Sequence, residues 1–465
     1  MHEGDEAGSV LRFGRAGDVP VRPVVRSARL ASIPLGFAGR RVAATGKRMI
    51  GRPRVEVDAE LHARTARHMF EVLGELRACA AKLGQFLSIY ELVLPAQIAA
   101  PYRVALSQLQ ESTPAMLPSA VHAVLAEQLG EGWRGLFRDF DDRHAAAASL
   151  GQVHRAVWND GRTVAVKLMY PGAREAVAGD LRHLKRVSWL ASPFLSGADI
   201  RGIVDELCLR ITDELDYELE AANQRRFAAA YAGSADFLVP AVVHQCGEVL
   251  ITEWVDGKPL SQVIANGHQR ERDRVGELFL RFNLTGPAQC GLFYGDPHPG
   301  NYRVTADGRL AVFDFGACAE PPLGFTEMAA DLLAGIVGGD PDIMAANARR
   351  YGFVAPGVEL DAAALADELG LFREPLVQPT FRFSTKWLRS VVQHVSQLHL
   401  SNVNRQLTLP ARLTPIGRMF VAGAGVLCQI GGEVRVRDAV RTLVPEFVEV
   451  ANTAPITSIR SSDNH

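Results

Sequence analysis

The heptapeptide GDPHPGN at residues 295–301 constrains the fold of this chain more than any other stretch. It places a carboxylate (Asp296), an imidazole (His298) and a carboxamide (Asn301) on one short loop that two prolines stiffen. Asp, Pro, Gly and Asn are common in turns for conformational reasons alone, so an ordinary surface turn is the alternative. Asp314 favours the more specific interpretation, because it ends the strand-like stretch RLAVF thirteen residues after Asn301.

The spacing D-x4-N followed by DFG matches the signature set of protein kinases. In that chemistry the loop Asp orients or deprotonates the nucleophile, while the Asn and the DFG Asp hold a Mg²⁺ ion that bridges nucleotide phosphates. Mg²⁺ is a hard cation that prefers oxygen ligands in strict geometry. We therefore expect Asp296 to be the catalytic acid or base and Asn301 and Asp314 to be metal ligands.

The stretch TVAVKLMY predicts a strand with two distinct faces. Val164 and Val166 share one face with Leu168, whereas Ala165 and Lys167 lie on the other. Only six of the 50 basic residues are lysine, which makes a retained lysine notable, because its compact ammonium differs from the planar guanidinium of arginine. We expect Lys167 to face a cleft and contact phosphates. A surface lysine on an edge strand is the alternative.

The segment ITDELDYELEAANQRRF predicts a helix. Asp216, Glu220 and Asn223 fall on one of its faces at i, i+4 and i+7. Glu220 is the preferred ion-pair partner for Lys167, and Glu214 is the alternative. A solvated acidic helix face is the structural alternative for the whole segment.

The position of a kinase glycine-rich loop is occupied here by HAAAASLGQ, which contains no GxGxxG pattern. Ala146, Ala147 and Ala148 take the place of the glycines, and Ser149 follows. Alanine disfavours positive φ, so this loop should be stiffer than its glycine-rich counterpart and hold nucleotide differently.

The chain resembles the UbiB family of atypical kinases, which includes the AarF and ADCK proteins, over about residues 60–430. Six motifs carry the resemblance: AKLGQ (81–85), AAAS (146–149), VAVK (164–167), ELDYELEA (214–221), GDPHPGN (295–301) and DFG (314–316). The resemblance implies an α+β, two-lobed, protein-kinase-like fold. A small β-rich N-lobe and a helical C-lobe would be preceded by an N-terminal helical extension.

Lys82 and Gln85 resemble the KxGQ pair of that family, and Glu214 and Asp216 resemble its ExD pair. In such proteins these elements occupy the space of a protein substrate, so phosphorylation of proteins in trans is not expected. Lys82 would also belong to the catalytic set. A simple surface pair on a helix is the alternative for Lys82 and Gln85.

The resemblance also implies the nucleotide contacts. Backbone groups of an interlobe hinge at Glu253, Trp254 and Val255 would meet the adenine, and Ala165 and Lys167 would line the same cleft. The implied ligands are ATP or ADP and Mg²⁺.

The predicted organisation has five parts. They are a flexible basic arm (1–55), a helical KxGQ extension (56–133), a kinase-like N-lobe (134–255), a kinase-like helical C-lobe (256–450) and a tail (451–465). The arginine-rich arm suggests peripheral contact with an anionic membrane. No segment predicts a signal peptide or a transmembrane helix, so we expect a cytoplasmic protein, with peripheral attachment to the inner face of the membrane as a further option.

The preferred function is an ATPase or phosphotransferase of the UbiB type that supports the biosynthesis or handling of isoprenoid quinones or lipids. A small-molecule kinase resembling the aminoglycoside and choline phosphotransferases is one alternative, because their catalytic loop also reads GDxHxxN. A nucleotide-gated lipid-binding protein with little turnover is another. The net charge of −2 gives no support for nucleic-acid binding. The sequence leaves the oligomeric state and the phosphoryl acceptor open.

Overall fold

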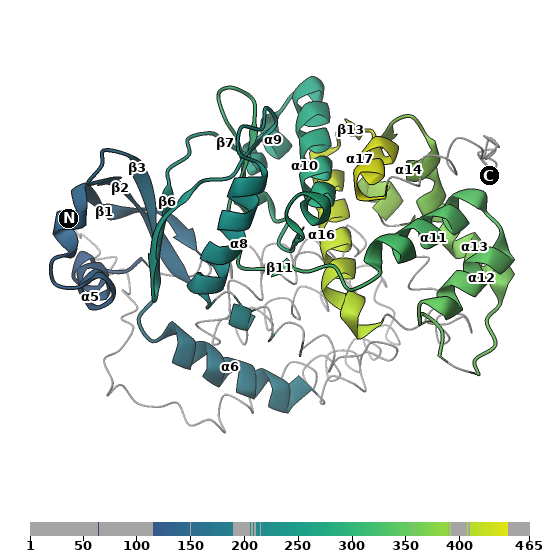
Figure 1. Cartoon of the computed structure of the whole chain (residues 1–465), viewed down its shortest axis with the longest axis horizontal. Helices are drawn as coiled ribbons and strands as arrows, with labels where there is room; N and C mark the ends of the chain where they lie inside the picture. The colour runs from purple at the N-terminus through teal and green to yellow at the C-terminus, as the bar shows by residue number, and fades with distance from the viewer. Residues whose placement is uncertain are drawn as a thin grey trace, which may run out of the picture. The chain divides into compact units, whose positions relative to one another are not determined.

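The computed structural model describes residues 64, 115–148, 150–188, 205, 208, 211–213, 215–355, 357–388, 390–391, 407 and 410–444, which are coloured in Figure 1. The chain divides into two compact units. The first comprises the described residues up to Glu218 together with Val243–Trp254, and the second comprises Leu219–Val242 and the described residues from Val255 onward.

The first unit is built on a five-stranded sheet in the order β1-β2-β3-β6-β5. Its strands are β1 (Phe137–Ala148), β2 (Gly151–Trp158), β3 (Thr163–Met169), β5 (Val242–Cys246) and β6 (Val249–Glu253). Its helices are α5 (Pro118–Leu129), the short 3-10 helix η1 (Trp133–Leu136) and α6 (Ala173–Ser188).

The core of this unit lies between α5 and the sheet. Val166 and Leu168 of β3 are completely buried together with Val121 and Leu125 of α5. The alternation predicted for β3 is therefore confirmed, because every second side chain points into this core. Although α5 falls within the predicted extension (56–133), it packs with the sheet.

The alanine-rich segment differs from its prediction as a loop. Ala146, Ala147 and Ala148 are the last residues of β1 and pair with Val153, Gln152 and Gly151 of β2, respectively. Alanine accommodates the extended backbone of a strand without strain, so the three residues continue the ladder to its end. The loop prediction was wrong for these residues, and Ser149 lies outside the described part of the chain.

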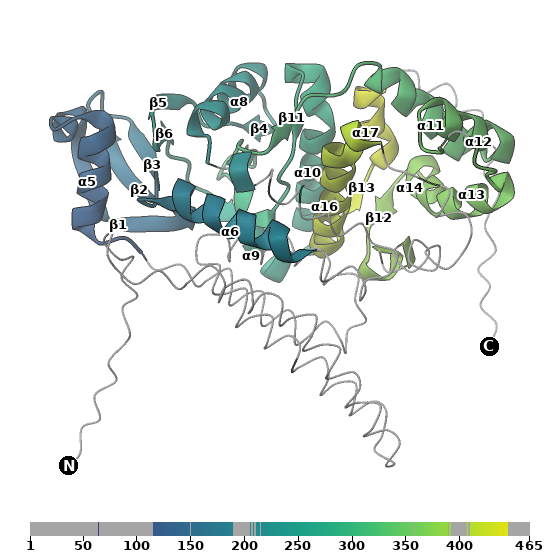
Figure 2. The ribbon, with the colours of Figure 1, turned by 90° about the horizontal axis from the view of Figure 1, so that it is seen from below.

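The second unit contains mainly helices: α8 (Tyr217–Ala230, whose first two residues group with the first unit), α9 (Leu260–Asn266), α10 (Gln269–Cys290), α11 (Phe325–Gly338), α12 (Pro341–Arg350), α13 (Ala362–Leu369), α14 (Arg373–Val377), α16 (Thr414–Ile430) and α17 (Val436–Leu443). The 3-10 helices in its described part are η3 (Pro299–Asn301), η4 (Gly370–Phe372) and η5 (Ala411–Leu413). Figures 1 and 2 show α16 alongside the long helix α10.

Short strands complete the second unit. One sheet has the order β4-β10-β9-β7, and two pairs are β11-β8 and β12-β13. Their bounds are β4 (Phe237–Leu238), β7 (Lys258–Pro259), β8 (Phe293–Tyr294), β9 (Tyr302–Val304), β10 (Leu310–Val312), β11 (Cys318–Ala319), β12 (Phe381–Arg382) and β13 (Glu433–Val434).

The segment Leu219–Val242 was placed in the N-lobe by the predicted boundaries, yet it groups with the second unit. Two contacts explain this. Phe227 of α8 is completely buried and packs on Phe282 of α10 with ring centroids 5.7 Å apart. β4 pairs in parallel with β10. Hydrophobic burial and strand pairing thus outweigh the proximity of this segment to β5 in sequence.

A series of hydrogen-bonded polar groups links β2 to β1 in the sheet of the first unit. His154 is completely buried in β2, and its Nε2 lies 2.7 Å from Nε2 of Gln152. On the other side its Nδ1 lies 2.8 Å from the carbonyl oxygen of Asp141. Since a carbonyl only accepts, Nδ1 carries the proton and Nε2 accepts from the Gln152 amide. Burial lowers the pKa of His154, and the hydrogen bond to Asp141 only partly opposes this effect.

This arrangement predicts a loss of stability of the first unit in acid. The unfolded chain takes up the His154 proton near pH 6.5, about the ordinary histidine pKa, whereas the folded chain resists it to lower pH. The contribution is therefore present above about pH 6.5 and is lost as the pH falls toward the folded pKa. Urea unfolding between pH 5 and pH 8 measures the effect. We expect His154→Gln to flatten this dependence and His144→Gln to reduce it much less, because repulsion from His144 lowers the pKa of His154 less than burial does. An unchanged slope in His154→Gln would contradict the assignment.

Candidate active site

The GDPHPGN loop is closed by its own hydrogen bonds. The carbonyl of Asp296 accepts from the backbone N–H of His298 at 2.7 Å and from Nδ2 of Asn301 at 3.0 Å. The same amide nitrogen lies 3.2 Å from Oδ2 of Asp296. His298 caps the 3-10 turn η3, since its Nδ1 accepts from the N–H of Gly300 at 3.1 Å. The side chains of Asp296 and Asn301 are thus held side by side.

Asp314 reaches this loop through the β9–β10 hairpin. β9 begins immediately after Asn301, and its first residue, Tyr302, pairs with Val312, the last residue of β10. One residue further, the N–H of Phe313 donates to the carbonyl of Asn301 at 2.9 Å. Asn301 and Asp314 therefore lie at the same end of the hairpin, as the sequence spacing predicted.

The backbone of Asp314 is strained. Its φ of +61° makes it the one non-glycine residue with positive φ in the described part of the chain. A side chain in this region costs free energy, and such outliers concentrate at functional sites, where the surrounding structure enforces them.

The donor set at this end of the hairpin fits a magnesium ion. Asn301 turns its amide nitrogen toward Asp296, so its Oδ1 is directed away from that contact. Asp314 adds a carboxylate, and its Oδ1 lies 3.4 Å from the backbone nitrogen of Gly316. A carboxylate and a carboxamide oxygen are ligands that Mg²⁺ prefers.

A buried tyrosine anchors the backbone of the residue that precedes Asp314. The hydroxyl of Tyr294 donates to the carbonyl of Phe313 at 2.6 Å. Burial raises the pKa of Tyr294 well above its usual value, and neighbouring Tyr302, Asp296 and Asp314 add to this rise. Tyr294 therefore stays protonated at neutral pH and serves as a fixed donor.

Helix α8 carries a buried carboxylate and a buried carboxamide, and the carboxamide contacts the DFG segment. Glu220 and Asn223 are both buried, and Nδ2 of Asn223 donates to the carbonyl of Phe315 at 3.0 Å. Asp216 was predicted on the same helix face, but α8 begins only at Tyr217. Asp216 instead lies in the turn before the helix and is exposed, which corrects that part of the prediction.

Lys167 lies on the face of β3 opposite the core and contacts an aromatic ring. Its Nζ is 5.0 Å from the ring centroid of Tyr217, and Tyr217 itself is buried. This cation–π contact restrains the ammonium. Sequence reasoning missed Tyr217, although an aromatic residue inside the acidic motif ELDYELEA was a visible signal.

The predicted hinge begins at Glu253, the last residue of β6. Glu253 pairs with Val164 in the sheet, and its carboxylate lies 3.4 Å from the guanidinium of Arg162. The N–H of Trp254 donates to the carbonyl of Thr163 at 2.9 Å. The chain passes from the first unit to the second between Trp254 and Val255.

The family model described as the ABC1 atypical kinase-like domain matches residues 108–348, more than half of the 465 residues. The chain belongs to this family. The mitochondrial atypical kinase coq-8 of Caenorhabditis elegans is 32% identical over 374 residues, which are 75% of this chain and 48% of that protein. A chloroplastic aarF domain-containing protein kinase of Arabidopsis thaliana is 33% identical over 312 residues, 64% of this chain and 43% of that protein. The chain thus spans about half the length of these curated relatives.

A solved structure supports the same family assignment. The complex of Rv3197 with erythromycin from Mycobacterium tuberculosis has a TM-score of 0.62 and 38% identity, covering 85% of this chain and 99% of that one. The predicted resemblance to the UbiB and AarF proteins and the kinase-like α+β fold are therefore confirmed. The roles predicted for single residues stay predictions.

Several predicted site residues lie outside the described residues. They are the KxGQ pair Lys82 and Gln85, Ser149 of the alanine-rich segment and Glu214 of the ExD pair, together with the arm (1–55) and the tail (451–465). The pairing of Lys167 with Glu220, or alternatively with Glu214, likewise stays a prediction.

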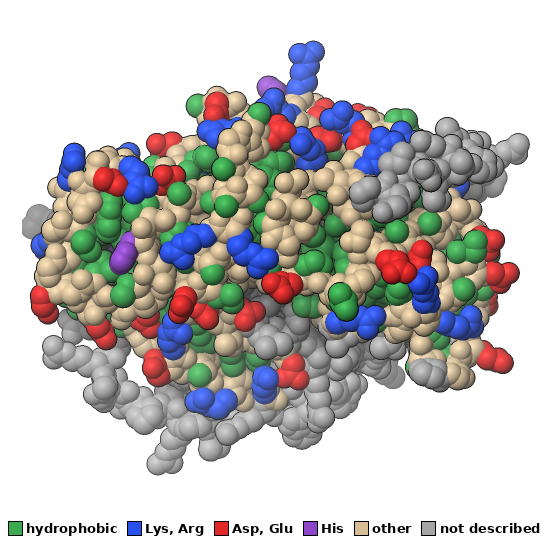
Figure 3. Space-filling model, viewed as in Figure 1, with side chains coloured by type: hydrophobic (Ala, Val, Ile, Leu, Met, Phe, Trp, Pro, Cys, Tyr) green, Lys and Arg blue, Asp and Glu red, His purple; other side chains and the backbone are tan. Residues whose placement is uncertain are grey.

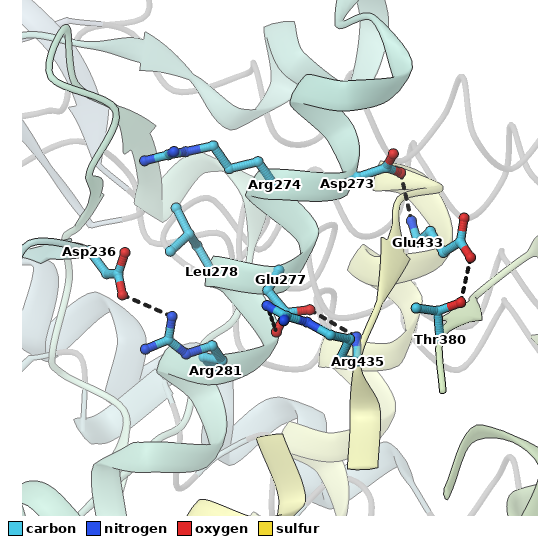
Figure 4. A pocket seen from close by; sticks show the side chains of 9 residues that line it. All are labelled: Asp236, Asp273, Arg274, Glu277, Leu278, Arg281, Thr380, Glu433 and Arg435. Carbon is cyan, nitrogen blue, oxygen red and sulfur yellow. Dashed lines mark hydrogen bonds and ion pairs between the residues drawn. The ribbon is translucent and has the colours of Figure 1, made fainter. Parts of the chain in front are cut away.

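A separate hollow of about 450 Å³ lies along α10 in the second unit. Figure 4 shows two pairs of oppositely charged side chains among those that line it. Arg281 lies 2.8 Å from Asp236, and Arg435 lies 3.4 Å from Glu277. None of the predicted catalytic or metal-binding residues lines this hollow, and its paired charges present no single sign to a ligand.

The described surface carries mixed charge. Figure 3 shows basic and acidic side chains interspersed over the face drawn. Among the described residues, no helix combines the length and the apolar character that crossing a bilayer requires.

Proposed function

We propose that this chain binds ATP, or alternatively ADP, with Mg²⁺ and transfers the terminal phosphoryl group of ATP to water or a small molecule. One observation carries the proposal: the amide of Asn301 is locked onto Asp296 at the end of the hairpin where the strained Asp314 follows β10. A turn with only a structural role requires neither that amide orientation nor that backbone strain.

Each side chain has a chemical task in this proposal. Asp296 accepts the proton of the attacking hydroxyl or water. Lys167 places its ammonium on the nucleotide phosphates, and the ring of Tyr217 limits its motion. Asn301 and Asp314 hold Mg²⁺, which when bound neutralises phosphate charge.

The biological role of this activity is inferred from the relatives. One of them is named an atypical kinase coq-8 of mitochondria, and another is a chloroplastic kinase of the aarF type. We propose that the activity supports the biosynthesis or handling of isoprenoid quinones or related lipids, with peripheral contact to an anionic membrane. Phosphorylation of proteins in trans is not part of the proposal.

The test is Mg²⁺-dependent ATP turnover by the purified protein, with and without vesicles of anionic phospholipid. We expect vesicles to stimulate turnover and Asp314→Asn to weaken Mg²⁺-nucleotide binding by about tenfold or more, because one of two anchoring oxygens loses its charge. Asp367→Asn is the matched control, since this carboxylate is exposed on α13 of the same unit. Nucleotide binding without turnover would favour a nucleotide-gated lipid-binding protein. Nucleotide binding and turnover that do not depend on Mg²⁺ would contradict the proposed metal site.

A second candidate function is binding of a macrolide. It rests on the solved complex of Rv3197 with erythromycin, a protein 38% identical to this chain over 85% of its length. Isothermal titration with erythromycin, with and without Mg²⁺-ATP, tests it. Saturable heat in both conditions would support a macrolide site independent of the nucleotide. Erythromycin that is modified after incubation with the protein and Mg²⁺-ATP would support a small-molecule kinase.

A further inference from the structure

Asp314 is held in its strained conformation by contacts on both sides. On the preceding side, the carbonyl of Phe313 accepts from the hydroxyl of Tyr294 at 2.6 Å, and its N–H donates to the carbonyl of Asn301. On the following side, the carbonyl of Phe315 accepts from Nδ2 of Asn223 at 3.0 Å. The residue with positive φ therefore lies between two anchored neighbours.

We propose that Asn223 is a positioning residue that keeps the carboxylate of Asp314 in place for Mg²⁺. The inference rests on the proposed function, because it concerns the metal ligand of that site. Asn223 itself touches neither metal nor nucleotide in this proposal. It acts through the backbone of the segment that follows Asp314.

Helix α8 contacts Phe315 twice. Asn223 bonds its backbone carbonyl, and Phe227, one turn further along α8, packs on its ring with centroids 5.0 Å apart. Phe315 is completely buried, so its ring cannot leave this contact without exposing apolar surface. Spacing of i and i+4 places both contacts on the same face of α8.

The chemistry of position 223 is specific. The carbonyl of Phe315 is buried with its partner, and a buried acceptor that loses its donor destabilises the conformation that buries it. The rest of the anchoring would persist without Asn223, because the contacts on the Phe313 side are independent of α8. We therefore expect removal of the amide to loosen Asp314 while the fold persists.

Gln224 provides a matched control. It is also a buried carboxamide on α8, and its Nε2 also donates to a backbone carbonyl, that of Pro240, at 2.8 Å. The two residues are neighbours in sequence, yet only Asn223 is bonded to the DFG segment. Asn223→Leu and Gln224→Leu remove the same kind of hydrogen bond and differ in which backbone they release.

The experiment compares both variants with the parent by Mg²⁺ titration of nucleotide binding and by hydrogen exchange of the peptide that contains residues 313–318. We expect Asn223→Leu to raise the Mg²⁺ concentration at half-saturation by about tenfold, as for residues that support metal ligands from behind, and to speed exchange of that peptide. Gln224→Leu should change neither. If Asn223→Leu fails to fold, Asn223→Ser replaces it in both measurements.

The outcomes separate this inference from the proposed function. Mg²⁺-dependent nucleotide binding in the parent, with the same half-saturation and exchange in Asn223→Leu, would overturn the positioning role alone. Equal changes in both leucine variants would show a general effect of α8 and overturn it as well. Absence of Mg²⁺-dependent binding in the parent would overturn the proposed function and the inference with it.

Discussion

Replacement of Asp296 by asparagine is expected to lower ATP turnover by about 10²- to 10⁴-fold, the usual contribution of a general acid or base. The amide cannot accept the proton of the nucleophile, whereas the carbonyl of residue 296 still receives the N–H of His298 and the amide of Asn301. The loop should therefore keep its conformation, and nucleotide affinity should change little. Single-turnover kinetics with a parallel measurement of the dissociation constant separates the two quantities.

Two controls make this result specific. Asp367→Asn removes an exposed carboxylate of the same unit and should leave turnover unchanged. Lys167→Arg keeps the charge but replaces the compact ammonium above the Tyr217 ring with a planar group, so it should affect nucleotide affinity as well as rate. If Asp296→Asn retained parental turnover, Asp296 would not be the base, and orientation of the nucleophile would have to come from another group.

Sequence patterns predicted the parts of the site that depend on local order. The period of two in β3 placed Lys167 opposite the buried face. The spacing of Asp296, Asn301 and Asp314 predicted that they act together, and the structure places Asn301 and Asp314 at one end of the β9–β10 hairpin. In each case, strand alternation or a short connection between neighbouring strands carries the information. Such signals can be read from one sequence.

Other features depend on contacts between distant segments. The partner of Asn223 is a backbone carbonyl 92 residues away, and no local pattern specifies such a pair. The start of α8 at Tyr217 left Asp216 outside the helix, because helix boundaries are less strongly encoded than helix existence. The alanines at 146–148 were assigned by analogy with a loop, whereas pairing with β2 decides their conformation.

The first residue of the GDPHPGN loop gives the largest expected effect on stability. A Cβ atom on Gly295 would lie 1.9 Å from the carbonyl oxygen of Ala317, far inside any allowed contact. The obstacle is backbone, and it is fixed by the pairing of β8 with β11, in which Tyr294 faces Cys318. The φ of Gly295 is not positive, so close approach of two chain segments, rather than a left-handed turn, requires glycine here.

We expect Gly295→Ala to lower the free energy of unfolding of the second unit by about 3 kcal/mol, near the upper end of the usual cost of overpacking. Urea unfolding, with hydrogen exchange in β8 and β11 as the local readout, measures this loss.

Gly300 of the same heptapeptide is the matched control, because the Cβ there would lie 3.0 Å from Nδ1 of His298, a side-chain atom that can shift at the expense of its hydrogen bond from the N–H of Gly300. Gly300→Ala should change stability by less than about 1 kcal/mol. Equal losses in the two variants would mean that the loop tolerates no added atom anywhere. A loss confined to Gly295→Ala would show that the close approach of the chain at Gly295 to the backbone of Ala317 is what requires glycine at this position.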